Sequence, residues 1–431
     1  MKSVSVDSEK VIRKLMIKIV PFLMLLFATA IVDRVNVGFA ALEMNKSLNI
    51  SAGMYGFISG IFFISYFICE VPSNVIMYKV GAKRWIARIL ISWGIITVII
   101  GFARNSTQLG VLRFLLGAAE AGFYPAMILY MTYWFPSRFM AKAVATFMAA
   151  QAVANIVVGP ISAWILDNVN FMGMEGWRWL FIFEGIPAII FGIITMFVLI
   201  DRPEQAKFLT QEEKDWVTGE LKAELESKED GVKESKWKVL KQPRVWHLAI
   251  AFFCYVSANY GISLWLPQII KNLSGILSDT EVGLVSMLPY ICGAIAMYAN
   301  GKHSDKVMER RKHTGIPILA AFIGLVLLTK MSNVWLSMAC ICLSISGLYA
   351  FIGTFWTIPT AFLGEASAAV GIAAINAFAN LGGFSGPYLI GWLKGITGST
   401  NAGMYVLAGF ALLASILILI IPKDVEEVKR V

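Results

Sequence analysis

The chain has 431 residues, of which 58% are hydrophobic and only 15% are charged, and its mean hydropathy is +0.69. This is too apolar for a soluble protein of such length, and the apolar residues occur in blocks long enough to cross a bilayer. The net charge of +9 could suggest a nucleic-acid partner, but its distribution along the chain indicates membrane topology instead. The composition therefore predicts an integral membrane protein that binds no nucleic acid.

About twelve apolar segments approach the ~20 residues that span a bilayer as a helix. The loops between them are alternately basic and nearly free of base, so one side of the membrane holds most of the 37 lysines and arginines. The positive-inside rule places this side, with both termini, in the cytoplasm. No small-residue cleavage site follows the basic start, so we expect no removed signal peptide. The expected spans are 16–42, 53–78, 85–103, 107–135, 141–167, 177–200, 245–270, 281–300, 315–331, 334–363, 368–394 and 401–421.

A polar segment at 201–244 divides these spans into six and six. We expect a solvated cytoplasmic linker there, helical in part, between two six-helix bundles at 1–200 and 245–431. The predicted fold class is thus an all-α integral membrane protein with twelve transmembrane helices. Because outer-membrane proteins cross as β-barrels, we expect a multi-pass protein of the inner or plasma membrane. Tandem six-helix repeats with a ligand site at their interface are typical of transporters.

Arg113 and Glu120 lie within the apolar segment 107–135. Seven residues on a helix make nearly two turns, so the two charges share one face about 10 Å apart along the axis. Gly117 lies between them on that face and leaves room for a neighbouring helix or a ligand. An ionisable residue at membrane depth costs roughly 3 kcal/mol on insertion scales and usually faces a protein interior or a watery cavity. This pair is a strong functional signal, with a purely structural ion pair as the alternative.

The first span adds Asp33 and Arg34, which lie about 25 Å along a helix that enters from the cytoplasm. The fourth span enters from outside, which puts Arg113 in the same outer layer and Glu120 near the midplane. We expect a network in which Arg113 exchanges between the two acids. An acid that loses its arginine to a substrate carboxylate would take up a proton, which links one proton to one anion. We therefore expect Glu120 as principal proton carrier, Asp33 as its accessory, Arg34 as the carboxylate ligand and Arg113 as the switch.

Uncharged polar and aromatic residues within the spans are candidates for further substrate contacts. Tyr66 could hydrogen-bond an anion or serve as a plain aromatic wall. Amides inside spans can bond either a substrate hydroxyl or a neighbouring helix. We expect substrate contacts from Gln151 and Asn376, and helix contacts from Asn155 and Asn380.

The second half of the chain holds few charges within its spans and offers aromatic and amide surface instead, Trp356 included. Charge handling is therefore expected in the first half and recognition of shape or hydroxyl groups in the second. A monocarboxylate such as a sugar acid or small aromatic acid fits better than a rigid dicarboxylate, although Arg34 and Arg113 together could hold one. Glu184 lies toward the outer end of its span and is interpreted as structural.

Motifs spread over essentially the whole chain carry a resemblance to a known family. They are Asp33-Arg34-Val-Asn36, Glu70-Val-Pro72, Gly117-Ala-Ala-Glu120-Ala-Gly-Phe-Tyr-Pro125 with Trp134-Phe-Pro136, Trp177-Arg178-Trp179 and Phe183-Glu184-Gly-Ile-Pro187. With these features the sequence resembles the major facilitator superfamily and, within it, the anion:cation symporter family. The resemblance implies transport of a small organic anion, commonly with protons, with proton coupling at the matching Glu120 and charge pairing and anion binding at the matching arginines.

Two cytoplasmic loops resemble the superfamily's Gly-x-x-x-Asp-Arg/Lys signature. Residues 301–306 fit it, with Asp305 at the acidic position. The first-half copy has Tyr78 in place of the aspartate, while Lys83 and Arg84 still fit. Together with Glu70 near the cytoplasmic end of span two, Lys83, Arg84 and Asp305 are expected to act in gating.

The sequence thus predicts a secondary active transporter that imports a small organic anion by proton symport through alternating access. The alternative is an uncoupled facilitator or an anion exchanger for carboxylates. An enzyme is not expected, because no nucleophile–base pair, phosphate loop or metal cluster is present. All five cysteines lie in apolar segments, and His247, His303 and His313 lie near the cytoplasmic boundary, where we expect them to be solvated. We expect no cofactor besides protons, no metal, and a monomer in the lipid bilayer.

Overall fold

The structure is a computed structural model that describes residues 7–229, 236–362 and 365–422. The regular secondary structure of these residues is helical throughout. The membrane helices of the first half are α1 (Ser8–Ser47), α2 (Ala52–Val80), α3 (Ala82–Ile100), α4 (Ser106–Glu120), α5 (Phe123–Thr132), α6 (Ser137–Asn168) and α7 (Gly176–Val198). Those of the second half are α9 (Pro243–Ser274), α10 (Asp279–Val307), α11 (Arg311–Leu328), α12 (Val334–Phe355), α13 (Thr357–Phe362), α14 (Glu365–Thr397) and α15 (Asn401–Leu419).

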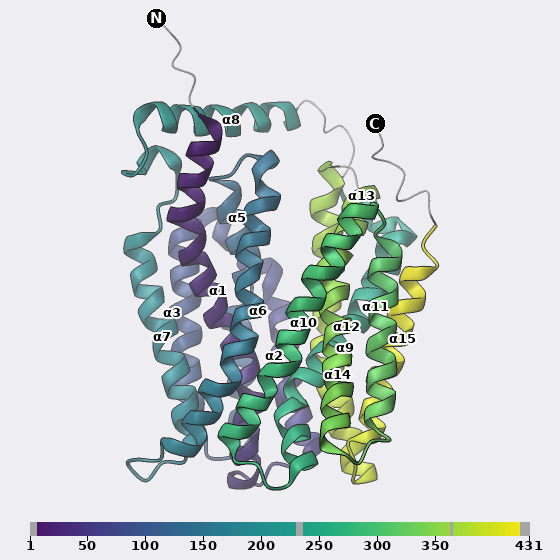
Figure 1. Ribbon diagram of the computed structural model, residues 1–431. Coiled ribbons are helices and arrows are strands. Elements are labelled where there is room, and N and C mark those ends of the chain that lie inside the picture. Colours follow the sequence, from purple (N-terminus) through teal and green to yellow (C-terminus); the bar gives the residue numbers. More distant parts are fainter. Residues whose placement is uncertain (1–6, 230–235, 363–364, 423–431) are drawn as a thin grey trace, which may run out of the picture.

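The described helices confirm an all-helical, multi-span membrane protein. By length and composition alone, ten of them are apolar enough to cross a membrane, with α4–α5 and α12–α13 each counted as one span. The remaining two long helices of the bundles are α3, which carries Lys83, Arg84 and Arg88 close to its start, and α14, which is rich in glycine and alanine. Both lie alongside the others (Figure 1), so each of the twelve segments expected from the sequence is helical over its described residues, two of them as a pair of consecutive helices.

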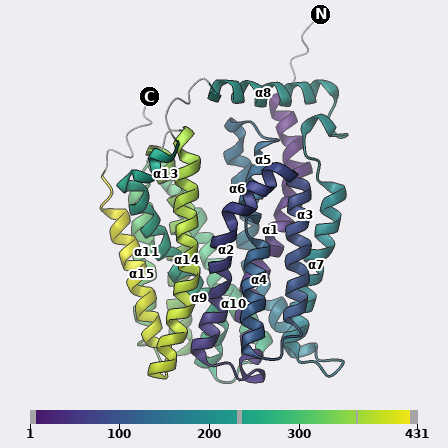
Figure 2. The same cartoon turned by 180° about the vertical axis from the view of Figure 1, so that it is seen from behind.

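The two halves of the chain lie side by side, with the first half on the left and the second on the right of Figure 1. The start of α1 and the end of α15 lie at the same end of the molecule. Helix α8 (Gln211–Glu229), flanked by the short helices η1 (Pro203–Gln205) and η2 (Lys236–Lys241), belongs to the polar segment between the halves. Helix α8 lies across that same end (Figure 2), as a partly helical cytoplasmic linker would. Residues 230–235 of the linker lie outside the described residues.

The two halves meet through the helix pairs α2 with α14, α6 with α10 and, less extensively, α1 with α9. Several hydrogen bonds cross between the halves near the outer end. The Tyr55 hydroxyl donates to the Leu264 carbonyl at 2.6 Å, and the Thr280 N–H donates to Asp167 at 2.7 Å. Gly159 of α6 faces α10 so closely that a Cβ there would lie 2.8 Å from the carbonyl oxygen of Gly283. The outer end is therefore closed by direct backbone packing.

We expect Gly283→Trp to prevent this outer closure and to slow transport. Overpacking costs about 1–3 kcal/mol, which corresponds to a shift of roughly 5- to 150-fold between open and closed forms. The measurement is labelling by an impermeant maleimide of a cysteine placed at Ser286, which is 1% exposed beneath the contact. Labelling from outside should increase in the tryptophan variant. The control is Gly409→Trp, where a Cβ meets nothing within 4 Å; equal labelling in both variants would contradict the closure.

The fourth span is broken, although the sequence suggested one continuous helix. Helix α4 ends at Glu120, and Gly122 adopts a left-handed backbone with φ 84° before α5 begins. A Cβ on Gly122 would lie 2.6 Å from the Ser73 hydroxyl oxygen of α2, so the break is held against a neighbouring helix. Gly117 lets α2 approach as expected, because a Cβ there would collide with the Phe62 carbonyl. Broken helices within membranes commonly mark binding sites.

Candidate functional site

A cavity of about 130 Å³ lies between the two halves. At the ~30 Å³ that each molecule occupies in liquid water, it has room for about four water molecules. Its walls come from both halves, from α1, α2, α5 and α6 and from α9, α12 and α14. The lining residues that the sequence predicted as substrate contacts are Arg34, Tyr66, Gln151, Trp356 and Asn376.

Arg34 connects this cavity to the buried acid Glu120. Its Nε donates to Glu120 Oε1 at 2.6 Å, and its Nη2 lies 2.5 Å from the same oxygen. The Arg34 side chain is 13% exposed and the Glu120 side chain is fully buried. The guanidinium also lies 5.0 Å from the ring centroid of Tyr66. An anion in the cavity would therefore meet Arg34 first and would compete with Glu120 for it.

Arg113 lies deeper and does not line the cavity. It is fully buried, its guanidinium lies 5.1 Å from the ring centroid of Phe62, and none of its three nitrogens has a hydrogen-bond partner among the residues that the structure describes. Asp33, 1% exposed, accepts from Thr97 Oγ1 at 2.7 Å through Oδ1, while its Oδ2 is unpartnered. Glu120 Oε2 is likewise unpartnered.

The four charged residues of the predicted network are thus gathered in one place. The pairing differs from the expected one, since Arg34 rather than Arg113 holds Glu120. The acids whose charges act on Arg113 are Asp33 and Glu120, so it lies where it could bind either. Buried polar atoms without hydrogen bonds destabilise a protein. Here they belong to the side chains of Arg113, Asp33 and Glu120, which could bind one another after a small movement. The geometry suits a switch with Arg113 uncommitted between two acids.

Sequence reasoning missed part of the cavity wall. The helix α9 contributes Tyr255, Asn259 and Tyr260, and α5 contributes Tyr124. The available signal was the spacing of Tyr255 and Asn259, because residues four apart share one helix face and polar residues within a span face protein rather than lipid. Asn380, expected only as a helix contact, also lines the cavity.

The predicted gating and helix-contact residues differ in their surroundings. Glu70, 6% exposed, accepts at 3.2 Å from Asn380 of α14, so it connects the two halves. Asn155 donates at 2.9 Å to the Tyr349 hydroxyl of α12, as a helix contact should. Arg84 is exposed, and the backbone N–H of Lys83 donates to Asp201 at 3.0 Å. Asp201, just after α7, therefore caps the start of α3. The loop itself has Tyr78 where the signature has an aspartate, so the capping carboxylate comes from outside the loop.

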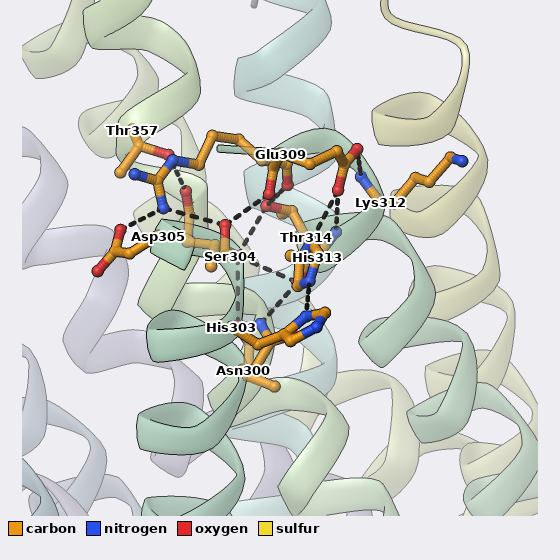
Figure 3. A network of polar contacts seen from close by, with 12 residues as sticks. Asn300, His303, Ser304, Asp305, Glu309, Lys312, His313, Thr314 and Thr357 are labelled. Carbon is orange, nitrogen blue, oxygen red and sulfur yellow. Dashed lines mark hydrogen bonds and ion pairs between the residues drawn. The ribbon is translucent and has the colours of Figure 1, made fainter. Parts of the chain in front are cut away.

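In the second half, the cytoplasmic ends of α10 and α11 carry a polar network (Figure 3). Asp305 lies 2.5 Å from Arg310, whose Nη1 also donates to Ser304 at 3.0 Å. The Ser304 hydroxyl in turn donates to the carbonyl of Glu309 at 2.6 Å. The residues of the predicted signature thus bind one another across the turn between α10 and α11, and Asp305 takes part through its ion pair with Arg310.

The histidines of this network are hydrogen-bonded; His303 is exposed, as the sequence suggested, and His313 is partly buried. His303 Nδ1 lies 2.7 Å from His313 Nε2, and His313 Nδ1 lies 2.6 Å from Glu309. Burial alone would raise the pKa of the Glu309 carboxyl, but hydrogen bonds from the Lys312 backbone and from His313 lower it below its ordinary value. Among the residues that the structure describes, no cluster of three or more histidine, cysteine or acidic side chains could hold a metal ion.

Several named transport proteins are similar in sequence over nearly the whole length of this chain. A protein of Agrobacterium vitis named "Putative tartrate transporter" is 42% identical over 421 residues, which cover 97% of this chain and 93% of the relative. The quinolone resistance transporter of Acinetobacter baumannii is 36% identical over 424 residues, covering 98% of each chain. The inner membrane transport protein RhmT of Escherichia coli K12 is 33% identical over 410 residues, covering 95% of each.

Solved structures confirm the fold. The crystal structure of a D-xylose-proton symporter superposes with a TM-score of 0.73 at 13% identity, over 96% of this chain and 99% of the other. The sequence profile of the Major Facilitator Superfamily matches residues 22–387, which is most of the chain. The protein is thus a multi-pass membrane transporter and not an enzyme, and it belongs to the major facilitator superfamily.

Proposed function

We propose that this protein is an anion:cation symporter that imports a small hydroxylated organic acid together with protons. The observation that carries this proposal is the Arg34–Glu120 ion pair, which joins a cavity-lining arginine to a fully buried acid. In this proposal protons are the coupling ion, no other cofactor takes part, and the protein acts as a monomer in the inner or plasma membrane.

Coupling follows from competition for one guanidinium. A substrate carboxylate that binds Arg34 displaces Glu120, and a buried carboxylate without a cation is unfavourable by several kcal/mol. Glu120 then either takes up a proton or pairs with Arg113, which has no other hydrogen-bond partner. In the second case Asp33 becomes the acid without a cation and takes the proton. In both cases one anion brings in one proton, with Glu120 as principal carrier and Asp33 as accessory.

The substrate class follows from the cavity lining. Arg34 is the lining residue able to bind a carboxylate by charge, and the surrounding amides and phenols can bond hydroxyl groups. Gln151, Asn259 and Asn376 offer both donors and acceptors. This arrangement suits a carboxylate at one end and hydroxyls along the rest of the molecule, as in sugar acids. Tartrate carries the same two kinds of group, with a second carboxylate at its other end. The relative named for tartrate supports the same class.

The test is uptake into proteoliposomes that contain only this protein, under an imposed inward proton gradient. The substrate panel is tartrate, sugar acids, small aromatic acids and a quinolone. We expect tartrate or a sugar acid to accumulate and a protonophore to abolish the accumulation. Transport of the quinolone alone would contradict the substrate class. Equilibration without accumulation, at every gradient, would instead indicate the alternative function, an uncoupled facilitator or exchanger.

A further inference from the structure

Glu184 of α7 is a buried acid that the mechanism above does not use. It is 8% exposed, its Oε1 accepts from the Ser162 hydroxyl of α6 at 2.8 Å, and its Oε2 has no hydrogen-bond partner in the described part of the chain. Asn36 of α1 reaches it and is fully buried, and neither of its amide atoms has a partner within the described residues. Two unpartnered polar groups thus face one another inside the first half of the protein.

The register of α1 against α7 brings Glu184 close to the coupling site. The two helices run antiparallel, and at the outer end the Trp177 N–H donates to Glu43 at 3.1 Å. Seven residues inward on each helix, about 10 Å, lie Asn36 and Glu184. Asp33 lies one turn deeper on α1, within electrostatic range of Glu184. Asn36 therefore lies level with Glu184 and, three residues from Asp33, on the same face of α1 as that residue of the proposed coupling site.

Counting charges indicates which acid is neutral. Apart from Asp279, which pairs with Lys271 at the outer end of α10, the structure buries four acids within the spans that it describes, namely Asp33, Glu70, Glu120 and Glu184. Arg34 and Arg113 are the basic groups near them, and an unpaired buried charge costs several kcal/mol. Arg34 holds Glu120, and Arg113 interacts with Asp33 and Glu120. Two of the four acids must therefore hold a proton for the cluster to be neutral.

The surroundings of Glu184 favour its assignment as one of these two acids. The groups that face it are the Ser162 hydroxyl, the Asn36 amide and Asp33, while α3 presents backbone at Gly94 to the neighbouring Gly185. No cation is among them in the described structure. A carboxyl with only hydroxyl, amide and acidic neighbours is more stable neutral than charged.

We propose that Glu184 is a third proton site, which exchanges its proton with Asp33 across the Asn36 amide. This inference deepens the proposed function and rests on its proton coupling. When Glu184 is protonated, the amide oxygen accepts its O–H while the amide nitrogen donates to ionised Asp33. The O–H bond of Glu184 breaks and an O–H bond forms at the Oδ2 of Asp33, while the Asn36 amide keeps both of its own N–H bonds. The amide then turns over, so that its oxygen accepts from Asp33 and its nitrogen donates to Glu184. Glu184 gains the negative charge that Asp33 loses. Neutral Asp33 no longer attracts Arg113, which is then free to pair with Glu120.

Glu184→Gln tests this, because glutamine keeps the bond to Ser162 but cannot carry a proton. In proteoliposomes we expect substrate counterflow to stay within about twofold of wild type and proton-driven uptake to fall at least about fivefold, the lower end of typical coupling effects. Glu184→Asp should restore the proton-driven rate. A merely structural Glu184 would leave both rates of the glutamine variant unchanged, and that outcome would overturn the proposal.

A second readout does not depend on transport. Infrared difference spectra of the protein in lipid, recorded between two pH values, report protonated carboxyls directly. We expect Glu184→Gln to lose one such component that wild type and Glu184→Asp retain. An unchanged spectrum would overturn the proposal even if uptake is affected.

A further variant covers the case in which Glu184→Gln fails to fold. Asn36→Leu keeps both acids and removes the amide that links them, so unaltered proton-driven uptake in this variant would also overturn the proposal. A wild type that shows the component without accumulating any acid would refute the proposed symport alone.

Discussion

Replacing Glu120 by glutamine is expected to abolish proton-driven accumulation while substrate exchange continues. With one proton per monovalent anion the transported load is neutral, so a gradient of one pH unit supports about tenfold accumulation. Glutamine can still accept a hydrogen bond from Arg34, but it carries neither the charge that competes with substrate nor the proton. The expected concentration ratio across the membrane is therefore about one at any gradient, measured in proteoliposomes with the best substrate of the panel.

The matched control is Glu212→Gln, which makes the same chemical change on the exposed face of the linker helix α8. It should leave accumulation and exchange at wild-type values. Undiminished accumulation by Glu120→Gln would refute the coupling role of Glu120 and leave it a structural partner of Arg34. Loss of exchange as well would show that the charge of Glu120 is needed for the conformational change itself.

The sequence predicted the helices well because their signal is local. A run of about 20 apolar residues must form its backbone hydrogen bonds within a helix, so each expected span is present in the structure. The break after Glu120 was not predicted. It depends on the left-handed backbone of Gly122 against α2, and a glycine in an apolar run is equally compatible with close helix packing. The crosswise position of α8 likewise depends on contacts between distant residues.

The members of the charged cluster could also be identified from sequence, because charges within spans are few and costly. Their pairing could not. Arg34 and Arg113 are both within reach of Glu120, and the choice depends on the rotation of α1 relative to α4, which no residue pattern encodes. Glu184 was interpreted as structural from its distance to the outer end alone. Its proximity to Asp33 follows only from the antiparallel register of α1 and α7.

Arg34→Ala should give the second large effect, a loss of substrate binding. Removing one partner of a buried charge pair costs about 3 kcal/mol, roughly 150-fold in affinity. The same change leaves Glu120 buried without its cation, so Glu120 should hold its proton permanently and proton-driven uptake should stop. The measurements are the dissociation constant of the purified protein for the transported acid and the uptake rate. Arg138→Ala is the control, since that arginine side chain is 55% exposed.

The double variant Arg34→Ala with Glu120→Gln decides whether these two residues form one functional unit. Removing either residue should abolish coupled uptake, and removing both should add little to the loss of Arg34 alone, because residues in direct contact do not contribute independently. Arg34→Lys keeps the charge but loses the planar fork that binds a carboxylate through two nitrogens, so binding should be intermediate. Independent effects of the two single changes would show that substrate and proton meet at separate sites, and the competition for Arg34 would be refuted.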